Sequence, residues 1–426
     1  MIPRNLPLVL MLLGVLFSLA VSAASGKGAP RPEVNGNYAM PTGIDDPDAA
    51  IADWTFSDPV YMWRLLNRPE DPFEPPAYFY WPDALIVGDL KPFFPLASQP
   101  AISPQALDDM GQWAQSHKSN VLIVVHRGEV VLEQYWNGVS PDTLVNGRAM
   151  TRSMAPLLLG FAVRDGGVSL DDPIGRYIQS WEQDPRGAIT VRQLAQNVSG
   201  LQLPERLPAT QVLGNGFMCL SYCGDVNRAA LAFPLIDEPG RVFNVADQNM
   251  QILAMVIESA MAQPIEEILS ERVWKKIGAS DATFQRDRPG GKARVMCCMR
   301  ATARDWARLG VLVMRDGNWQ GQQILPAGWI ATMANPSPVN SNHGIGLWLG
   351  TPYDPLRTYY SGQPGVIPMS EPFLADDVRI IEGGGFRVLY MSPSHDLVIF
   401  RHGVGVPDWD GAALVNIALR GMKKQN

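Results

Sequence analysis

The stretch that decides the fold is Gly147-Arg148-Ala149-Met150-Thr151-Arg152-Ser153-Met154-Ala155-Pro156-Leu157-Leu158-Leu159-Gly160-Phe161-Ala162-Val163-Arg164-Asp165-Gly166-Gly167. Its apolar run and the closing glycines, which are typical of a helix C-terminus, predict a core helix from about Ala149 to Arg164. Pro156 opposes this start. Inside a helix it removes one backbone hydrogen bond and crowds the carbonyl of Arg152, at a cost of about 3 kcal/mol unless the helix kinks or begins later.

Length and composition allow a large core. The chain has 426 residues, of which 46% are hydrophobic and 18% are charged. We therefore expect one large domain with an extension, or two domains. The formal net charge of -7 argues against a nucleic-acid partner, because such a partner requires a basic face.

The N-terminus has the pattern of a secretory signal. Arg4 precedes an apolar run from Leu6 to Val21, and Val21-Ser22-Ala23 has the small-x-small form of a cleavage site. We predict a signal peptide over residues 1–23 and an exported chain, periplasmic or secreted, with no stable membrane span after cleavage. The alternative is an uncleaved anchor helix, although an apolar run of about sixteen residues is short of the roughly 20 that a span needs.

Residues 24–100 form an N-terminal arm rich in proline and aromatic residues, most densely over 71–82. Proline at this density blocks regular helix and sheet, so we expect an irregular segment whose rings pack on the domain behind it. The alternative is a lid over a binding site.

The cysteines are Cys219, Cys223, Cys297 and Cys298. Their spacing does not suit a metal site, whereas export allows disulfides. Adjacent cysteines do not pair easily, so we expect a bridge from the 219–223 segment to the 297 segment, although the sequence alone leaves the connectivity open.

Residues 101–426 have the element order of an α+β domain, with an antiparallel sheet flanked by helices and an all-helical region. A helix begins at Ser103-Pro104, and a hairpin follows over 121–135 with Gly128 in its turn. Late strands at 387–391 and 397–401 are expected to join the same sheet. Capping boxes are predicted at Thr190 and Thr302, and further helices over 249–262 and 264–276.

Several phrases of this domain occur together: Ser169-Leu170-Asp171-Asp172-Pro173-Ile174, Ile189-Thr190-Val191-Arg192-Gln193-Leu194 with Ser199-Gly200-Leu201, Pro239-Gly240-Arg241-Val242-Phe243-Asn244, Val273-Trp274-Lys275-Lys276-Ile277-Gly278, Ala301-Thr302-Ala303-Arg304-Asp305 and Pro393-Ser394-His395-Asp396. In this order, over about residues 101–405, they resemble the class C-like branch of the serine β-lactamase and penicillin-binding-protein superfamily. The resemblance implies a β-lactamase/transpeptidase-like fold. It also implies hydrolysis of an amide or ester through an acyl-serine, without metal or cofactor.

The chemistry of that family depends on three motifs. A Ser-x-x-Lys at a helix N-terminus supplies the nucleophile and its base, and a Tyr-x-Asn-like motif supplies a second proton-transfer group. A Lys-Thr-Gly or looser strand walls the pocket and helps to bind the oxyanion. The flanking phrases assign these positions to Ala149, Arg152, Val245, Asp247 and Ile381-Glu382-Gly383.

These substitutions leave none of the catalytic residues intact. Alanine has no nucleophile, arginine stays protonated and valine carries no proton to move. The chain contains no Ser-x-x-Lys in any register. Ser153, one turn later, fits better as a helix serine bonded to a backbone carbonyl. Tyr135-Trp136-Asn137 and His126-Arg127-Gly128 match the motifs by letter only, because they belong to the early hairpin.

A rebuilt pocket has the candidates Thr151, Arg152, Asp247, Glu382, Gly383 and Arg387. Arg152 and Arg387 would bind a carboxylate if both face the cleft. We favour the alternative, an internal ion pair of Arg152 with Asp247 or Glu382.

We therefore expect a non-catalytic homologue that binds an unknown small molecule or envelope component in the cleft between the three motif positions. One alternative is an active serine hydrolase or esterase with a non-standard nucleophile. Another is an envelope interaction protein that docks through its aromatic arm.

Overall fold

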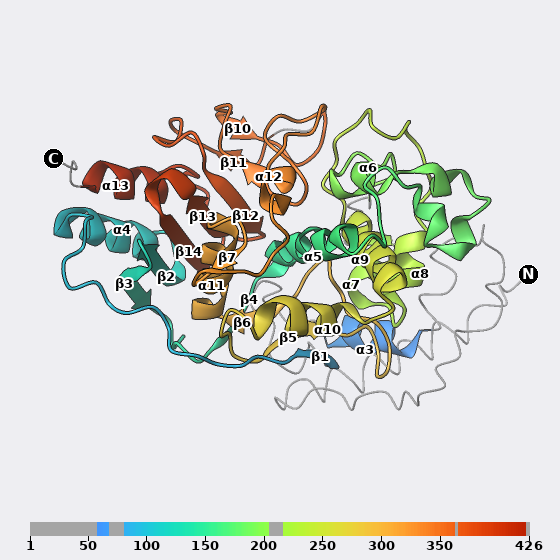
Figure 1. Ribbon diagram of the computed structural model, residues 1–426, viewed down its shortest axis with the longest axis horizontal. Helices are drawn as coiled ribbons and strands as arrows, with labels where there is room; N and C mark the ends of the chain where they lie inside the picture. The colour runs from blue at the N-terminus through green and yellow to red at the C-terminus, as the bar shows by residue number, and fades with distance from the viewer. Residues whose placement is uncertain (1–57, 68–80, 204–215, 363–364, 423–426) are drawn as a thin grey trace, which may run out of the picture. The chain divides into compact units, whose positions relative to one another are not determined.

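The computed structural model describes residues 58–67, 81–203, 216–362 and 365–422 (Figure 1). The expected signal peptide and the densest part of the arm lie outside them. The chain divides into two compact units. One holds Met1–Asp83, Pro204–Ala232 and Gln285–Lys292; the other holds Ala84–Leu203, Phe233–Phe284 and Ala293–Asn426. Each unit is described by itself.

In the smaller unit, α3 (Pro59–Leu66), α7 (Gly216–Tyr222) and α8 (Val226–Leu231) pack together. Asp58 caps α3 and also accepts a hydrogen bond of 2.6 Å from the amide of Gly224. The buried Arg64 donates to the carbonyl oxygens of Tyr222 and Arg286. Charged groups therefore hold the centre of this unit through backbone contacts.

The disulfides differ from the expected bridge between segments. Cys219 bonds to Cys223 and Cys297 bonds to Cys298. The expectation was wrong because residues four apart on a helical turn already lie within reach, with 4.7 Å between the Cα atoms of Cys219 and Cys223. The adjacent pair forms with Cys298 in the left-handed backbone region, at φ 74°.

The larger unit is built on a six-stranded antiparallel sheet. Its strand order is β3-β2-β14-β13-β12-β9. The early hairpin thus shares a sheet with the late strands, as the sequence predicted. The strands are β2 (Ser119–His126), β3 (Glu129–Tyr135), β9 (Trp348–Leu349), β12 (Arg379–Gly383), β13 (Arg387–Ser392) and β14 (Leu397–Gly403).

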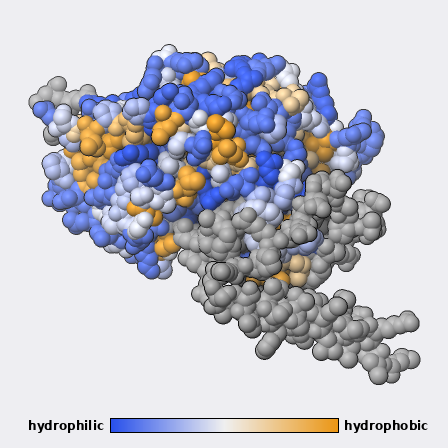
Figure 2. Space-filling model, turned by 90° about the horizontal axis from the view of Figure 1, so that it is seen from below, coloured by the Kyte–Doolittle hydropathy of each residue, from blue (hydrophilic) through white to orange (hydrophobic). Residues whose placement is uncertain are grey.

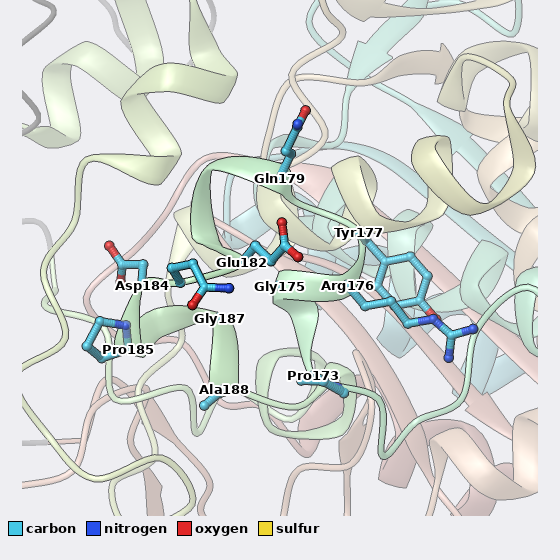
Figure 3. Close-up of a pocket in the computed structure, with 11 residues that line it drawn as sticks. Pro173, Gly175, Arg176, Tyr177, Gln179, Glu182, Asp184, Pro185, Gly187 and Ala188 are labelled. Atoms are coloured by element: carbon cyan, nitrogen blue, oxygen red, sulfur yellow. The ribbon is translucent and has the colours of Figure 1, made fainter.

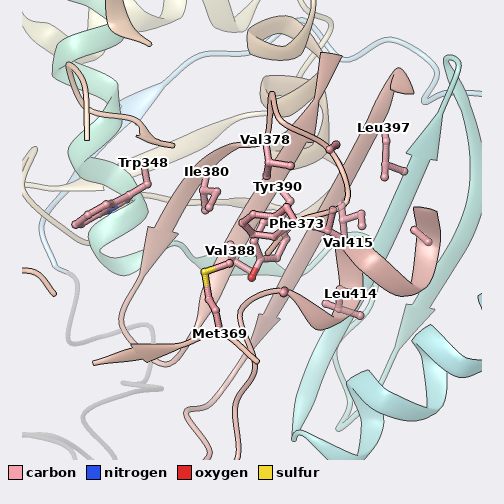
Figure 4. Close-up of a cluster of buried hydrophobic side chains, with 14 of the residues drawn as sticks. Trp348, Met369, Phe373, Val378, Ile380, Val388, Tyr390, Leu397, Leu414 and Val415 are labelled. Carbon is pink, nitrogen blue, oxygen red and sulfur yellow. The ribbon is translucent and has the colours of Figure 1, made fainter. Parts of the chain in front are cut away.

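Helices cover both faces of this sheet. On one face, α4 (Pro104–Ser116) and α13 (Ala413–Gly421) bury an apolar cluster in which Leu414 and Val415 lie near Val388 and Tyr390 of the sheet (Figure 4). On the other face, α11 (Ala303–Met314) packs against β13 and β14, with Trp306 stacked on Phe400. This two-sided burial explains why the central strands are apolar on both faces.

The predicted core helix begins later than expected. Residues Arg148–Ser153 form a 3₁₀ turn, and the α-helix, α5, runs from Met154 to Arg164. Pro156 is therefore the third residue of α5, where its missing N–H would have no acceptor within the helix. The expected penalty for Pro156 is avoided by this late start.

Further helices surround α5, which contacts α9 (Asp247–Met261), α10 (Ile265–Leu269) and α12 (Trp329–Met333). The capping box at Thr190 is present and begins α6 (Val191–Ala195). Thr302 caps α11 by accepting from the amide of Asp305. The segment after α10 continues as a π-turn, Ser270–Trp274. The remaining strands are β1 (Asp83–Ile86), β4 (Leu144–Asn146), β5 (Ala282–Gln285), β6 (Arg300–Thr302), β7 (Asn318–Trp319), β8 (Gln322–Gln323), β10 (Leu356–Arg357) and β11 (Ile367–Pro368).

The expectation that residues 24–100 are irregular was wrong where they are described, because α3 and β1 lie within them and Pro59 stands in the first turn of α3, where proline is tolerated. Residues 84–100 belong to the larger unit. Phe94 packs against Trp319, and the guanidinium of Arg308 lies over the ring of Phe93. Leu90 and Leu96 stay exposed. In Figure 2 the apolar side chains on the visible face form separate patches between polar ones.

Candidate functional site

The three segments that carry the expected motif positions meet in the larger unit. The 3₁₀ turn Arg148–Ser153 contacts β12. Gly383 makes this approach possible, because a Cβ there would lie 2.6 Å from the carbonyl oxygen of Gly147 and 2.9 Å from the amide nitrogen of Met150. The glycine of the third motif is therefore required by packing, whatever the chemistry of the site.

Arg152, at the expected lysine position, pairs with Asp247 at the expected asparagine position. Its Nε donates to Oδ1 of Asp247 at 2.7 Å, and its Nη2 contacts the same oxygen. The two side chains are 24% and 10% exposed. Asp247 is the first residue of α9, where a carboxylate is also stabilised by the helix dipole. The structure thus contains the internal ion pair that we favoured over ligand binding.

This ion pair fixes the charge of Arg152. Burial, the largest single effect, lowers its pKa, but Asp247 together with Tyr360 and Tyr359 outweighs burial, and the pKa is raised above its ordinary value. Arg152 is a permanent cation and has no lone pair with which to take a proton.

Val245, at the expected tyrosine position, is 6% exposed and belongs to the apolar cluster on the sheet. Its backbone N–H donates to the carbonyl oxygen of Tyr359 at 3.0 Å. The segment around it is also tied to the Ser199-Gly200 loop, since the amide of Asn244 donates to the carbonyl of Asn197 and Asn249 accepts from the hydroxyl of Ser199.

Glu382, in the third motif, forms an ion pair with Arg357, and their side chains are only 6% and 4% exposed. Tyr359 donates its hydroxyl to Oε1 of Glu382 at 2.6 Å. Burial, followed by the charge of Glu382, raises the pKa of Tyr359 well above its ordinary value, so the phenol keeps its proton. Sequence reasoning missed Arg357 and Tyr359. The signal present was the short polar-aromatic run Arg357-Thr358-Tyr359-Tyr360 between proline-rich turns.

The other sequence candidates do not join this group. Thr151 is fully buried and accepts from the amide of Met299. Arg387 is fully buried and donates to His402 and to the carbonyl of Gly384. It lies opposite Gly383 while Glu382 lies opposite Val388, so Arg387 and Glu382 point to opposite faces of the sheet. These contacts argue against a carboxylate clamp formed by Arg152 and Arg387.

Ser153 and the two hairpin segments that resemble the motifs, Tyr135-Trp136-Asn137 and His126-Arg127-Gly128, have structural roles. The hydroxyl of Ser153 donates to the carbonyl of Gly346 at 2.6 Å. Tyr135 ends β3, which is an edge strand, and Gly128 takes the left-handed turn conformation between β2 and β3.

Two cavities lie among the described residues of the larger unit, one of them beside the third motif. A cavity of about 10 Å³, the room of about one water, is lined by residues that include Tyr359, Glu382 and Gly383. A hollow of about 750 Å³ lies elsewhere, between 3₁₀ turns over residues 173–188 (Figure 3). Its lining includes Arg176, Tyr177 and Glu182.

Within the described ranges, no group of three or more His, Cys, Asp or Glu side chains has the arrangement of a metal site. No helix among those residues is long and apolar enough to cross a membrane.

The model of one protein family, Beta-lactamase, matches residues 106–401. The chain belongs to the Beta-lactamase family. The match runs from α4 to β14 and includes all the motif positions described above.

Curated relatives of this family member are distant. A 6-aminohexanoate-dimer hydrolase of Paenarthrobacter ureafaciens is 23% identical over 238 residues, which cover 53% of this chain and 60% of the relative. Protein flp of Staphylococcus aureus is 21% identical over 175 residues, covering 38% of this chain and 34% of the relative. The matches thus span less than two thirds of either relative.

Solved structures share the fold. A putative 6-aminohexanoate-dimer hydrolase from Bacillus anthracis has a TM-score of 0.64 at 19% identity and covers 89% of this chain and 97% of its own. A family VIII carboxylesterase has a TM-score of 0.55 at 16% identity, covering 76% of this chain and 99% of its own. The β-lactamase-like α+β fold expected from the sequence is confirmed.

Proposed function

We propose that this chain is an exported, catalytically silent member of the Beta-lactamase family that binds a small molecule or an envelope component. The Arg152–Asp247 ion pair carries the proposal. The pair occupies the two positions assigned to the family's lysine and asparagine. The cation at position 152 therefore contacts a carboxylate and no nucleophilic hydroxyl.

The chemistry of the three positions supports this reading. Acyl transfer needs a hydroxyl that loses its proton to a neighbouring base. Ala149 has no hydroxyl, Arg152 has a raised pKa, and the buried side chain of Val245 has no proton to exchange. Ser153 is one turn away, with its hydroxyl bonded to a backbone carbonyl.

The alternative is an active amide or ester hydrolase with a non-standard nucleophile. It is favoured by the names of two similar proteins, a 6-aminohexanoate-dimer hydrolase and a family VIII carboxylesterase. Under this alternative some serine of the chain must be reactive.

Active-site labelling separates the two. The purified mature protein is treated with a serine-reactive fluorophosphonate and, separately, with a fluorescent penicillin, and adducts are mapped by peptide mass. We expect no stoichiometric adduct. An adduct on any serine refutes the proposal that the protein is catalytically inactive. Loss of that adduct in a Ser153→Ala variant identifies Ser153 as the nucleophile.

A restoration variant tests the assignment of positions. Ala149→Ser, Arg152→Lys and Val245→Tyr are combined, with Asp247→Asn added because the carboxylate would otherwise hold the new lysine. Hydrolysis of p-nitrophenyl acetate should rise above that of the matched control Ala149→Ser alone, which lacks the base. A folded combined variant that equals this control contradicts the assigned positions.

Export and docking are tested separately. The mass of the protein recovered from the producing cells should correspond to cleavage after Ala23. If partner binding disappears when residues 24–80 of the arm, which spans 24–100, are removed from a still folded protein, docking through the arm replaces binding in the cleft.

A further inference from the structure

The segment Arg357–Ser361, called the strap below, connects the two sides of the expected cleft. On one side it pairs with the backbone of Phe243–Val245, the segment that carries the tyrosine position. On the other side its side chains reach Glu382 of the third motif.

The backbone contacts have the pattern of an added β-strand. Asn244 and Tyr360 form an antiparallel bridge. The amide of Val245 donates to the carbonyl of Tyr359 at 3.0 Å, and the amide of Ser361 donates to the carbonyl of Phe243 at 2.9 Å. An extended peptide that binds to a strand edge uses the same backbone pairing for affinity.

The side-chain contacts provide specificity at alternate positions. The guanidinium of Arg357 pairs with Glu382 and lies 4.7 Å from the centre of the Trp348 ring. Tyr359, two residues on, packs on the same tryptophan at 5.4 Å and donates to the same carboxylate. One acidic residue and one indole thus hold both side chains, as pockets for alternate residues hold a bound strand.

The backbone pairing brings the strap within two residues of Asp247, because Val245 donates to Tyr359, and Tyr360 and Tyr359 help to raise the pKa of Arg152. It therefore contacts two of the motif positions, Val245 and Glu382, and a cavity beside Tyr359 and Glu382 has room for about one water.

We infer that the strap is an intramolecular ligand. The cleft between the motif positions is then a groove for an extended peptide that has an arginine followed two residues later by a tyrosine. The chain fills this groove with its own residues 357–361. This inference rests on the proposed function, since it names the ligand class of the silent cleft. Any peptide partner that uses the groove has to displace the strap.

Hydrogen exchange tests the strap by a conservative change. Tyr359→Phe keeps the ring and removes the hydroxyl that binds Glu382. Because hydrogen bonds to charged groups are among the stronger ones, we expect exchange of the amides of Val245 and Ser361 to accelerate about tenfold. Tyr353→Phe is the matched control, since it removes a hydroxyl bond to the carbonyl of Met369 outside the strap and should leave those two amides unchanged.

Two exchange results overturn the inference. One is unchanged exchange at Val245 in Tyr359→Phe. The other is faster exchange throughout α5 and α9 as well, because the strap would then be part of the domain core and no separate occupant of a groove.

Peptide binding tests the groove. The probe is a fluorescent, capped peptide with the sequence of residues 356–361. The double variant Arg357→Ala/Tyr359→Ala, first checked for folding by circular dichroism, should bind this peptide at least tenfold more tightly than the unaltered protein does. Adding Glu382→Ala should abolish that gain, and a scrambled peptide should not bind.

A folded double variant that does not bind the peptide overturns the inference, and if it does not fold, the exchange result for Tyr359→Phe decides. These outcomes differ from those of the proposed function. A serine adduct refutes catalytic silence and leaves the strap intact, whereas unchanged exchange refutes the strap and leaves catalytic silence standing.

Discussion

Replacing Glu382 by alanine should measure how strongly the buried charges hold the β12 side of the site. The change leaves the guanidinium of Arg357, whose side chain is 4% exposed, without its counter-charge. It also removes the acceptor of the Tyr359 hydroxyl. Breaking a buried ion pair by removing one partner costs about 3 to 5 kcal/mol, and the lost hydroxyl bond belongs to the same network, so the two effects are not summed.

Urea denaturation at pH 7, followed by tryptophan fluorescence, gives this free energy of unfolding. Glu371→Ala is the matched control, because Glu371 pairs with Arg420 at the surface, where the side chains are 33% and 53% exposed. Solvent screens such a pair, so the control should stay near the unaltered protein.

The double replacement Arg357→Met/Glu382→Leu should recover much of the loss, since apolar residues of similar volume avoid the cost of burying charge. The reasoning is refuted if Glu382→Ala destabilises the protein no more than Glu371→Ala does. The pair would then be solvated in solution.

Three further outcomes are expected. Gly383→Ala should destabilise the protein by about 1 to 3 kcal/mol, because its Cβ would meet the backbone of the 3₁₀ turn. The neighbouring Gly384→Ala should not, because its Cβ would make only an ordinary contact of 3.5 Å with Nε of Arg148, and thermal melting of both variants checks this. Burial lowers the pKa of His343 from about 6.5 to about 3. Its contribution to stability is therefore complete above pH 6.5 and is lost as the pH falls from there towards 3, by up to about 5 kcal/mol. His343→Leu should flatten the pH dependence of the urea midpoint in that window, and an unchanged slope contradicts the assignment. After mild reduction, iodoacetamide should label the partly exposed pair Cys297–Cys298 before the fully buried pair Cys219–Cys223, and peptide mapping that finds the reverse order contradicts the exposures described.

Local sequence signals predicted the elements whose structure depends on near neighbours. Ser103-Pro104 begins α4, the residues from 119 to 135 form the hairpin, and Thr190 forms its capping box with Gln193. In each case the deciding contact joins residues a few positions apart, so the sequence contains the information directly.

The start of α5 was misplaced because the apolar run was taken as helical from Ala149, whereas the backbone forms a 3₁₀ turn as far as Ser153. Pro156 contained the correct signal, since its ring fits a first helical turn. The disulfides were misjudged because a general reluctance of adjacent cysteines to pair was applied without knowledge of the local backbone.

The site was predictable only where a motif supplied positions. Arg152 was expected to pair with Asp247 or Glu382 because all three occupy motif positions, and it pairs with Asp247, 95 residues away. Arg357 and Tyr359 lie outside every motif and reach Glu382 through the tertiary fold, from 25 and 23 residues away. No periodicity or spacing rule describes such a contact.

The Arg152–Asp247 pair also sets an order in which sequence change can proceed. Asparagine at 247 would leave a partly buried guanidinium without its carboxylate, whereas lysine at 152 would keep an opposite charge beside Asp247. A lineage that moves between the two states is therefore expected to change position 152 while the acid is present and position 247 only afterwards. Among homologues, arginine at 152 should occur together with an acid at 247, and this covariation links the 3₁₀ turn before α5 to the start of α9.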